Sequence, residues 1–232
     1  MIGLILIAFT WVLLRFERKN LSDIGFNKPL QRSKELVVGI FIAALFCLTQ
    51  NLLSSYLGNF EWKVNSGFTI SSTLESFRWV LNSVLYEELL FRGYLFYKAI
   101  QLFGARLACT ITAVAFGIYH WFSYEVFGQP VTMFYVFILT AIPGFMFGYA
   151  FVRTKSLILP IGLHLGWNMV NIIVFSRGSV GQQLLTAEPV SGLTSIVGWE
   201  AILVNLIIPL SLPLLVISVL KYSSLYEKKE SH

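Results

Sequence analysis

The chain has 232 residues, of which 56% are hydrophobic and only 12% are charged. A soluble domain of this size cannot bury so much apolar surface, so the composition excludes an ordinary soluble protein and indicates a polytopic membrane protein. The formal net charge of +5 does not indicate a nucleic-acid partner, because the basic residues are concentrated in the connections on one side of the apolar segments.

Seven apolar segments follow one another along the chain, and most are long enough to cross about 30 Å of hydrocarbon. They predict an all-α fold, a polytopic transmembrane helical bundle of about seven membrane segments, as a single integral membrane domain over residues 1–232. The first segment is short for a complete crossing, and its basic residues follow it, unlike those of a cleavable signal peptide. The segments are Ile2 to Leu14, Leu36 to Leu57, Leu74 to Phe96, Leu107 to Phe122, Val131 to Val152, Ser156 to Phe175 and Val197 to Leu220.

Lysine and arginine are divided unevenly between the two sets of connections. If the segments alternate in direction, only Lys63, Arg78 and Arg177 lie on one side. The other side is the cytoplasmic one by the positive-inside rule, so we expect a multi-pass protein of the cell membrane with its N-terminus outside and its C-terminus in the cytoplasm. The cytoplasmic set is Arg15, Arg18, Lys19, Lys28, Arg32, Lys34, Arg92, Lys98, Arg106, Arg153, Lys155, Lys221, Lys228 and Lys229.

The third segment carries two adjacent carboxylates and an arginine within an apolar run. Ionisable groups at membrane depth cost at least a few kcal/mol each, so they usually face the protein interior and pair with one another. Glu88 and Arg92 are four residues apart, which predicts an ion pair on one helix face, whereas Glu87 projects about 100° away. The pair could be purely structural, and Glu87 is left free for chemistry. We expect this helix to continue past the bilayer to Lys98, and the Gly-, Ser- and Gln-rich stretch 176–196 to be a flexible external loop.

Two later segments carry the other polar groups. His120 ends the fourth segment, and His164 and Asn168 share one face of the sixth. A lone membrane histidine is often a core residue hydrogen-bonded to a neighbouring helix. Polar groups confined to three helices must satisfy one another, however, so we expect these helices to converge. Counted from the basic turns, His120 lies deeper in the membrane than Glu87 and His164.

These residue types allow hydrolytic chemistry. A carboxylate can take a proton from water and a histidine can relay it, while a histidine and an asparagine on one helix face can donate hydrogen bonds to a developing oxyanion. The chain has no GxSxG, no paired Ser and Lys, and no suitably placed Cys. The nucleophile of an acyl transfer would therefore be water.

Three short motifs follow one another in the third, fourth and sixth segments. In order and spacing they resemble the signature motifs of the CAAX protease and bacteriocin-processing family, called CPBP or Abi, of intramembrane proteases. The resemblance covers residues 74–175, a CPBP-like catalytic core, and a weaker likeness occurs at residues 21–26. The motifs are Glu87-Glu88-x-x-x-Arg92, Phe116-x-x-x-His120 and His164-x-x-x-Asn168.

The resemblance implies a CAAX-type intramembrane endopeptidase that uses glutamate-activated water and no cofactor. The implied partners are the lipid bilayer and a hydrophobic or lipidated peptide, such as a prenylated CAAX tail or a bacteriocin or pheromone leader, and we expect the site to open toward the cytoplasmic face. The implied roles are general base for Glu87, orientation of the water for His120, an oxyanion hole for His164 and Asn168, and support of this geometry for Glu88 and Arg92.

Alternatives remain for the metal and for the function. Glu87, His120 and His164 form a His₂Glu set of the kind that binds catalytic zinc, although the chain has no HExxH motif. An alternative from another functional class is a non-catalytic membrane adaptor that regulates a partner protein or confers bacteriocin immunity. A transporter with a carboxylate proton relay is a third possibility, against which the lack of an evident inverted repeat argues.

Overall fold

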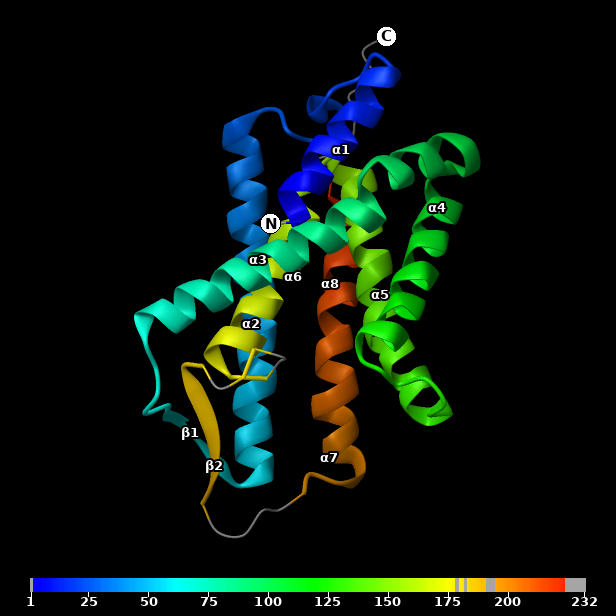
Figure 1. The fold of residues 1–232 in the computed structure, drawn as a ribbon. Coiled ribbons are helices and arrows are strands. Elements are labelled where there is room, and N and C mark those ends of the chain that lie inside the picture. Colours follow the sequence, from blue (N-terminus) through cyan, green and yellow to red (C-terminus); the bar gives the residue numbers. More distant parts are fainter. Residues whose placement is uncertain (1, 178–179, 182, 191–194, 224–232) are drawn as a thin grey trace.

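The computed structural model describes residues 2–177, 180–181, 183–190 and 195–223, which form a helical bundle with one small sheet (Figure 1). Lys228 and Lys229 of the predicted basic set lie outside these residues. The elements are α1 Ile2–Phe16, the 3-10 turn η1 Leu21–Ile24, α2 Pro29–Gly58, β1 Phe60–Val64, α3 Ile70–Arg92, α4 Tyr94–Ser123, α5 Pro130–Thr154, α6 Ile158–Asn168, the π-helical turn η2 Met169–Val174, β2 Leu185–Pro189, α7 Gly198–Ile202, the π-helical turn η3 Leu203–Ile207 and α8 Ile208–Tyr222.

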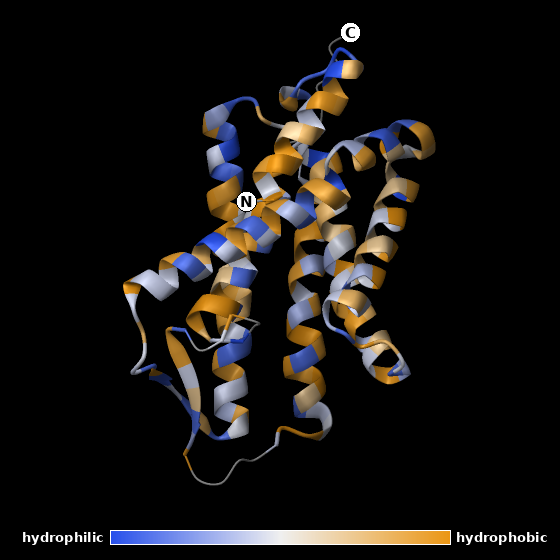
Figure 2. Ribbon diagram, viewed as in Figure 1, coloured by the Kyte–Doolittle hydropathy of each residue, from blue (hydrophilic) through white to orange (hydrophobic). Residues whose placement is uncertain are grey.

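Four helical stretches in the described part of the chain are long and apolar enough to cross a membrane: 21–58, 70–123, 130–154 and 198–222. The predicted number of about seven segments is therefore not confirmed. The apolar stretches 2–16 and 158–174 are shorter. At 1.5 Å per residue, α1 spans only about 22 Å. Hydrophobic residues cover most of the helices (Figure 2). Because four helical stretches are long and apolar enough to cross a membrane, the chain is a multi-pass membrane protein.

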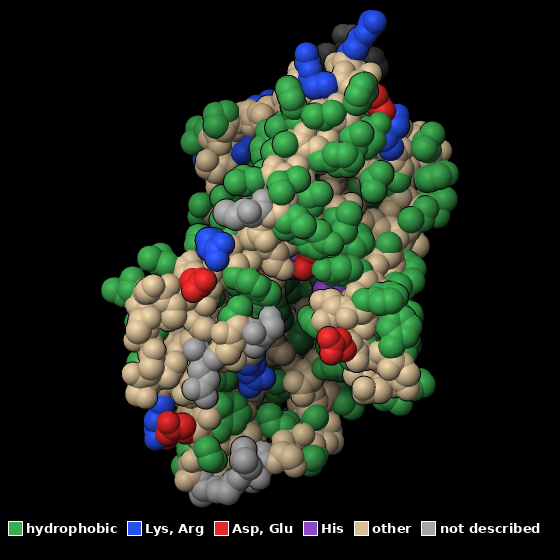
Figure 3. Space-filling model, in the orientation of Figure 1, with side chains coloured by type: hydrophobic (Ala, Val, Ile, Leu, Met, Phe, Trp, Pro, Cys, Tyr) green, Lys and Arg blue, Asp and Glu red, His purple; other side chains and the backbone are tan. Residues whose placement is uncertain are grey.

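Basic side chains are unevenly distributed over the molecule. On the face shown in Figure 3, Lys and Arg gather around the end at which α8 finishes, and fewer lie in the other half. This end also holds the turns after α1 and α5 (Figure 1). The arrangement agrees with the asymmetry read from the sequence, in which most connections on one side are basic.

The predicted continuation of the third helix to Lys98 is wrong. Helix α3 ends at Arg92, because Gly93 leaves the helical conformation with ψ −138°. A Cβ atom at Gly93 would lie 2.2 Å from the carbonyl oxygen of Leu89, so only glycine fits at this break. A second interruption follows at Gly104, where φ is 77° and ψ is 163°. The chain thus turns sharply before the part of α4 that carries His120.

The fold departs from the all-α prediction at one place. Strand β1 pairs antiparallel with β2, with Phe60 opposite Pro189 and Val64 opposite Leu185. The stretch 176–196, predicted as a flexible loop, therefore contributes a strand, and its residues 178–179, 182 and 191–194 lie outside the described residues. Pairing between segments so distant in sequence leaves no local pattern from which to predict it.

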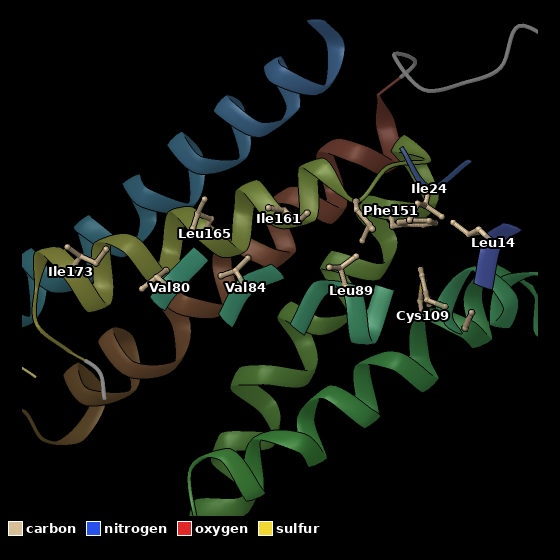
Figure 4. Packing of buried hydrophobic residues seen from close by; sticks show 13 residues of the cluster. Leu14, Ile24, Val80, Val84, Leu89, Cys109, Phe151, Ile161, Leu165 and Ile173 are labelled. Carbon is tan, nitrogen blue, oxygen red and sulfur yellow. The ribbon is translucent and has the colours of Figure 1, made fainter. Parts of the chain in front are cut away.

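A hydrophobic cluster joins the helices around α3. Figure 4 shows Val80, Val84 and Leu89 of α3 facing Ile161 and Leu165 of α6. All five side chains are buried, and between membrane helices such contacts stabilise through van der Waals packing. This packing holds α3 against the helix that carries His164.

Helix α6 lies unusually close to α2 because glycines line the contact. A Cβ atom at Gly162 would lie 2.6 Å from the carbonyl oxygen of Leu36, and one at Gly166 would lie 2.3 Å from that of Ile40. Small residues allow such close backbone approach between membrane helices. Since His164 lies between the two glycines, this contact determines its position in the bundle.

The stretch 21–26 holds the start of α6. The backbone N–H of Leu157 donates a hydrogen bond of 3.1 Å to the carbonyl oxygen of Ile24, and both side chains are fully buried. Gly25 follows with φ 108°, and a Cβ atom there would lie 2.3 Å from Cα of Ser156. The stretch therefore helps to place the start of the helix that carries His164 and Asn168.

Substitution of Gly25 by Ala is expected to lower the thermal unfolding temperature and the activity together. The left-handed conformation alone costs an alanine about 1–2 kcal/mol, and the contact with Ser156 adds to this cost. Gly67→Ala is the matched control, because its Cβ atom would meet no atom closer than 3.5 Å. Unfolding of the purified protein in detergent measures the effect, and equal stability of the two variants would contradict this role of Gly25.

Candidate active site

The five ionisable residues predicted within apolar segments lie together where α3, α4 and α6 meet. Each is buried, and Glu88 and Arg92 have no exposed surface. The predicted convergence of the three helices is therefore present. The five residues are Glu87, Glu88, Arg92, His120 and His164.

Glu88 is held from two sides by cationic or hydrogen-bonding groups. Its Oε1 lies 3.3 Å from Nη1 of Arg92, so the ion pair predicted from the four-residue spacing is formed. The same oxygen lies 2.8 Å from Nδ1 of His164. Nη2 of Arg92 donates a hydrogen bond of 3.0 Å to the carbonyl oxygen of Gly144. Glu88 thus connects the arginine of its own helix with the histidine of α6.

Aromatic rings surround the Arg92 guanidinium. Its Cζ lies 4.3 Å from the ring centroid of Phe116 and 5.2 Å from that of Phe147. Such cation–π contacts contribute most where the cation is removed from water. They partly replace the hydration that Arg92 loses on burial, which would otherwise make this position costly.

Glu87 has one oxygen that is held and one that is free. Its Oε1 accepts a hydrogen bond of 3.2 Å from Oγ of Ser83. Its Oε2 has no hydrogen-bond partner among the described residues, and it lies 4.0 Å from Nε2 of His120 and 3.8 Å from Nε2 of His164. Glu87, the carboxylate that the sequence predicts to be free of the Arg92 ion pair, therefore faces both histidines.

The hydrogen bonds of the histidines indicate where their protons lie. Nδ1 of His120 is 2.8 Å from the carbonyl oxygen of Phe116, which can only accept, so Nδ1 carries a proton and Nε2 of the neutral ring is an acceptor. Nδ1 of His164 likewise donates to Oε1 of Glu88. Nε2 of His164 can therefore donate only when its ring carries both protons.

The oblique course of α3 resolves the difference in depth predicted between Glu87 and His120. Figure 1 shows α3 crossing the bundle at an angle to α2, α5 and α8. Because the helix is tilted, counting residues from the basic turns does not give the depth of Glu87. The 4.0 Å distance between Glu87 Oε2 and His120 Nε2 shows that the two side chains meet.

A cavity of about 290 Å³ adjoins the cluster and is lined in part by His120, His164 and Asn168. The side chain of Asn168 makes no hydrogen bond with the described residues, so its amide is free toward the cavity. Glu87 does not line the cavity itself but lies next to the two histidines that do. Figure 3 shows a histidine and an acidic side chain at the edge of a hollow on this face of the molecule.

Sequence reasoning missed several residues that support the cluster. Ser83 lies one helical turn before Glu87, so an i,i+4 search for partners of the carboxylate would have found it. Phe147, whose ring stacks on His164 at 5.0 Å, and Gly144, whose carbonyl accepts from Arg92, lie on α5. Neither belongs to a polar motif, so no signal in the sequence connected them with the site.

The donor atoms of the alternative zinc site are spread more widely than zinc requires. Two ligands about 2.1 Å from a tetrahedral zinc lie about 3.4 Å apart. The free oxygen of Glu87 is 3.8 Å and 4.0 Å from the two histidine nitrogens. Within the described residues, no group of three or more His, Cys, Asp or Glu is placed to hold a metal ion. The side chains as they stand do not fit a zinc ion.

Comparison with protein-family models finds one family on this part of the chain. Residues 69–170 match the family described as type II CAAX prenyl endopeptidase Rce1-like. The match contains all six predicted site residues and overlaps most of the predicted core, 74–175. Neither the curated proteins nor the solved structures gave a match. Residues 69–170, which carry the buried glutamate, arginine and histidine cluster, are thus similar to the Rce1-like family of type II CAAX prenyl endopeptidases.

Proposed function

We propose that this protein is an intramembrane endopeptidase that hydrolyses a membrane-associated peptide with water activated by Glu87. The observation that carries the proposal is the unpartnered Oε2 of Glu87, 3.8 Å and 4.0 Å from two histidine nitrogens. One water molecule can bridge such a gap with hydrogen bonds of about 2.8 Å to each group. The site would then hold its nucleophile beside its base.

The proton transfers follow from the acceptors around that water. Glu87 accepts one proton as the water oxygen forms a bond to the carbonyl carbon of the scissile peptide. His120 accepts the other hydrogen bond through Nε2, because its Nδ1 proton is engaged by the Phe116 carbonyl. The bond to the amide nitrogen then breaks, and the departing amine takes the proton from Glu87.

The oxyanion of the tetrahedral intermediate needs donors on the other side of the carbonyl. Asn168 offers its free amide, and His164 offers Nε2–H when its ring is protonated. Glu88 accepts the hydrogen bond from Nδ1 of that ring and forms an ion pair with Arg92. Preorganised donors of this kind typically contribute about 10²–10³-fold to the rate.

The lining of the cavity supports a hydrophobic or lipidated peptide as substrate. Most of its side chains are apolar or aromatic, and none of the lining residues in the described part of the chain is Lys, Arg, Asp or Glu. The similarity of residues 69–170 to a CAAX endopeptidase family supports peptide hydrolysis. The substrate would reach the cavity from the bilayer, in which the chain is oriented with its basic end in the cytoplasm.

Incubation of the purified protein in nanodiscs with a panel of peptides tests the function. The panel contains prenylated CAAX peptides and bacteriocin and pheromone leader peptides, and mass spectrometry locates the cleaved bond. We expect cleavage at a single peptide bond in at least one class. A folded protein that cleaves none of them would contradict the proposal and favour a non-catalytic adaptor.

Exhaustive chelation is expected to leave cleavage within about twofold of the untreated rate, because water bound between Glu87 and the histidines is the proposed nucleophile. Metal analysis of the active sample should find less than one zinc per ten molecules. Loss of activity that is restored by zinc, and by no other divalent ion, would instead assign Glu87, His120 and His164 as ligands.

A further inference from the structure

Three prolines are among the described residues that line the cavity beside the site. Pro143 lies inside α5, and Pro209 and Pro213 lie in α8. A helical proline has no N–H to donate to the carbonyl four residues earlier, so that carbonyl loses its α-helical hydrogen bond. The carbonyls concerned belong to Leu139, Asn205 and Pro209. All three of these residues line the cavity as well.

The oxygens released in this way lie on the cavity side of their helices. A helical carbonyl points along the axis toward the residue four positions later, and the two residues share one helix face. Both members of the pair Leu139 and Pro143 line the cavity, and so do both members of the pair Pro209 and Pro213. Since α5 and α8 pack side by side (Figure 1), the two pairs belong to adjoining walls.

The carbonyl of Asn205 is the one for which the structure supplies a new donor. The hydroxyl of Tyr135, on α5, donates a hydrogen bond of 2.7 Å to this oxygen. The π-helical turn η3 lies directly before Pro209, where the α-helical ladder is interrupted. A carbonyl released by proline on this cavity is thus reached by a donor from outside its own helix.

The carbonyls of Leu139 and Pro209 receive no such donor. The hydroxyl groups closest to them along the chain are those of Thr140 and Ser211, and each donates at 2.7 Å to another carbonyl of its own helix. Within the described residues, no hydrogen bond from another segment reaches either oxygen. Membrane helices normally satisfy the groups released by proline through hydroxyls or neighbouring helices. These two oxygens are therefore open acceptors beside the site.

We propose that the carbonyl oxygens of Leu139 and Pro209 bind backbone N–H groups of the peptide substrate, which lies extended along the cavity. The identification of this peptide as a substrate rests on the proposed function. Every residue of an extended peptide except proline offers one backbone N–H. We therefore expect the site to tolerate different side chains at the two paired positions, and to reject proline there.

Pro143→Ala and Pro213→Ala test the proposal, because each alanine supplies the missing N–H to Leu139 or Pro209. Each variant should be at least as stable as the native protein, since proline is unfavourable inside a helix. Each should raise KM about fivefold, the size of one lost hydrogen bond, with kcat unchanged. Pro130→Ala is the matched control at the start of α5, where the N–H has no helical partner, and it should change neither constant.

A peptide series with one N-methyl group on each backbone nitrogen in turn gives a second readout that needs no proline variant. Binding is measured by fluorescence anisotropy in nanodiscs with Glu87→Gln protein, so the measurement does not depend on cleavage. We expect N-methylation to weaken binding about fivefold at two positions. Pro143→Ala should remove the penalty at one position and Pro213→Ala at the other, because each pair of changes removes the same hydrogen bond.

Three results would overturn the proposal. They are equal N-methyl penalties in all variants, proline variants that lose stability and binding together, and no binding of any panel peptide to the Glu87→Gln protein. Cleavage by the native protein with unchanged KM in both proline variants would reject this inference and leave the proposed function intact. Binding that follows the predicted pattern, without cleavage by the native protein, would support this inference and reject the proposed hydrolysis.

Discussion

Glu87→Gln is expected to lower peptide hydrolysis by about 10³-fold, in the range typical of a lost general base. Glutamine keeps the size of the side chain and can still accept the hydrogen bond from Ser83, which is 3.2 Å from Oε1 in the native site. It cannot take a proton from water at neutral pH. The variant should therefore insert, fold and bind substrate normally, with the loss confined to kcat.

Glu75→Gln is the matched control, because it makes the same chemical change on the same helix. The Glu75 side chain is 73% exposed, and among the described residues its only ion pair is a 3.5 Å contact with Arg78. Activity of this control should remain within twofold of the native protein. The rates are measured by single-turnover cleavage in nanodiscs. A Glu87→Gln variant that retains more than a tenth of native turnover would exclude Glu87 as the base.

Arg92→Met is expected to destabilise the protein by about 3–5 kcal/mol, because it removes one partner of the fully buried ion pair with Glu88. Methionine is close to arginine in length and can occupy the space between Phe116 and Phe147. The effect therefore reports the lost charge more than a lost volume. The free energy of unfolding in mixed micelles, or the thermal midpoint in detergent, provides the measurement.

Two further variants identify the cause of this destabilisation. Arg78→Met removes an arginine whose side chain is 61% exposed, and it should change stability by less than about 1 kcal/mol. Adding Glu88→Gln to Arg92→Met should recover part of the lost stability, because the orphaned buried charge is then also removed. A double variant less stable than Arg92→Met alone would show that Glu88 is not the source of the loss.

Local spacing predicted much of the site. The four-residue interval between Glu88 and Arg92 determines that both lie on one helix face, and the structure forms their ion pair. The same spacing places His164 and Asn168 beside one cavity. These predictions succeed because helix geometry depends only on neighbours along the chain. The roles assigned to the individual residues remain predictions.

Other features depend on contacts that no local pattern reveals. The length of the third helix was mispredicted because the apolar run continues through Gly93, whose conformation ends the helix. The sheet of β1 and β2 joins two loops that are separated by most of the bundle.

Composition and charge pattern alone place this chain in a membrane, because both are properties of the sequence and do not depend on how the chain folds. The order and spacing of the polar motifs also predict the candidate site residues. Tertiary structure decides which of them meet. Glycine contacts bring α6 against α2, and the tilt of α3 brings Glu87 to within 4.0 Å of both His120 and His164. Such distances result from the packing of whole helices, to which residues far apart in the sequence contribute together.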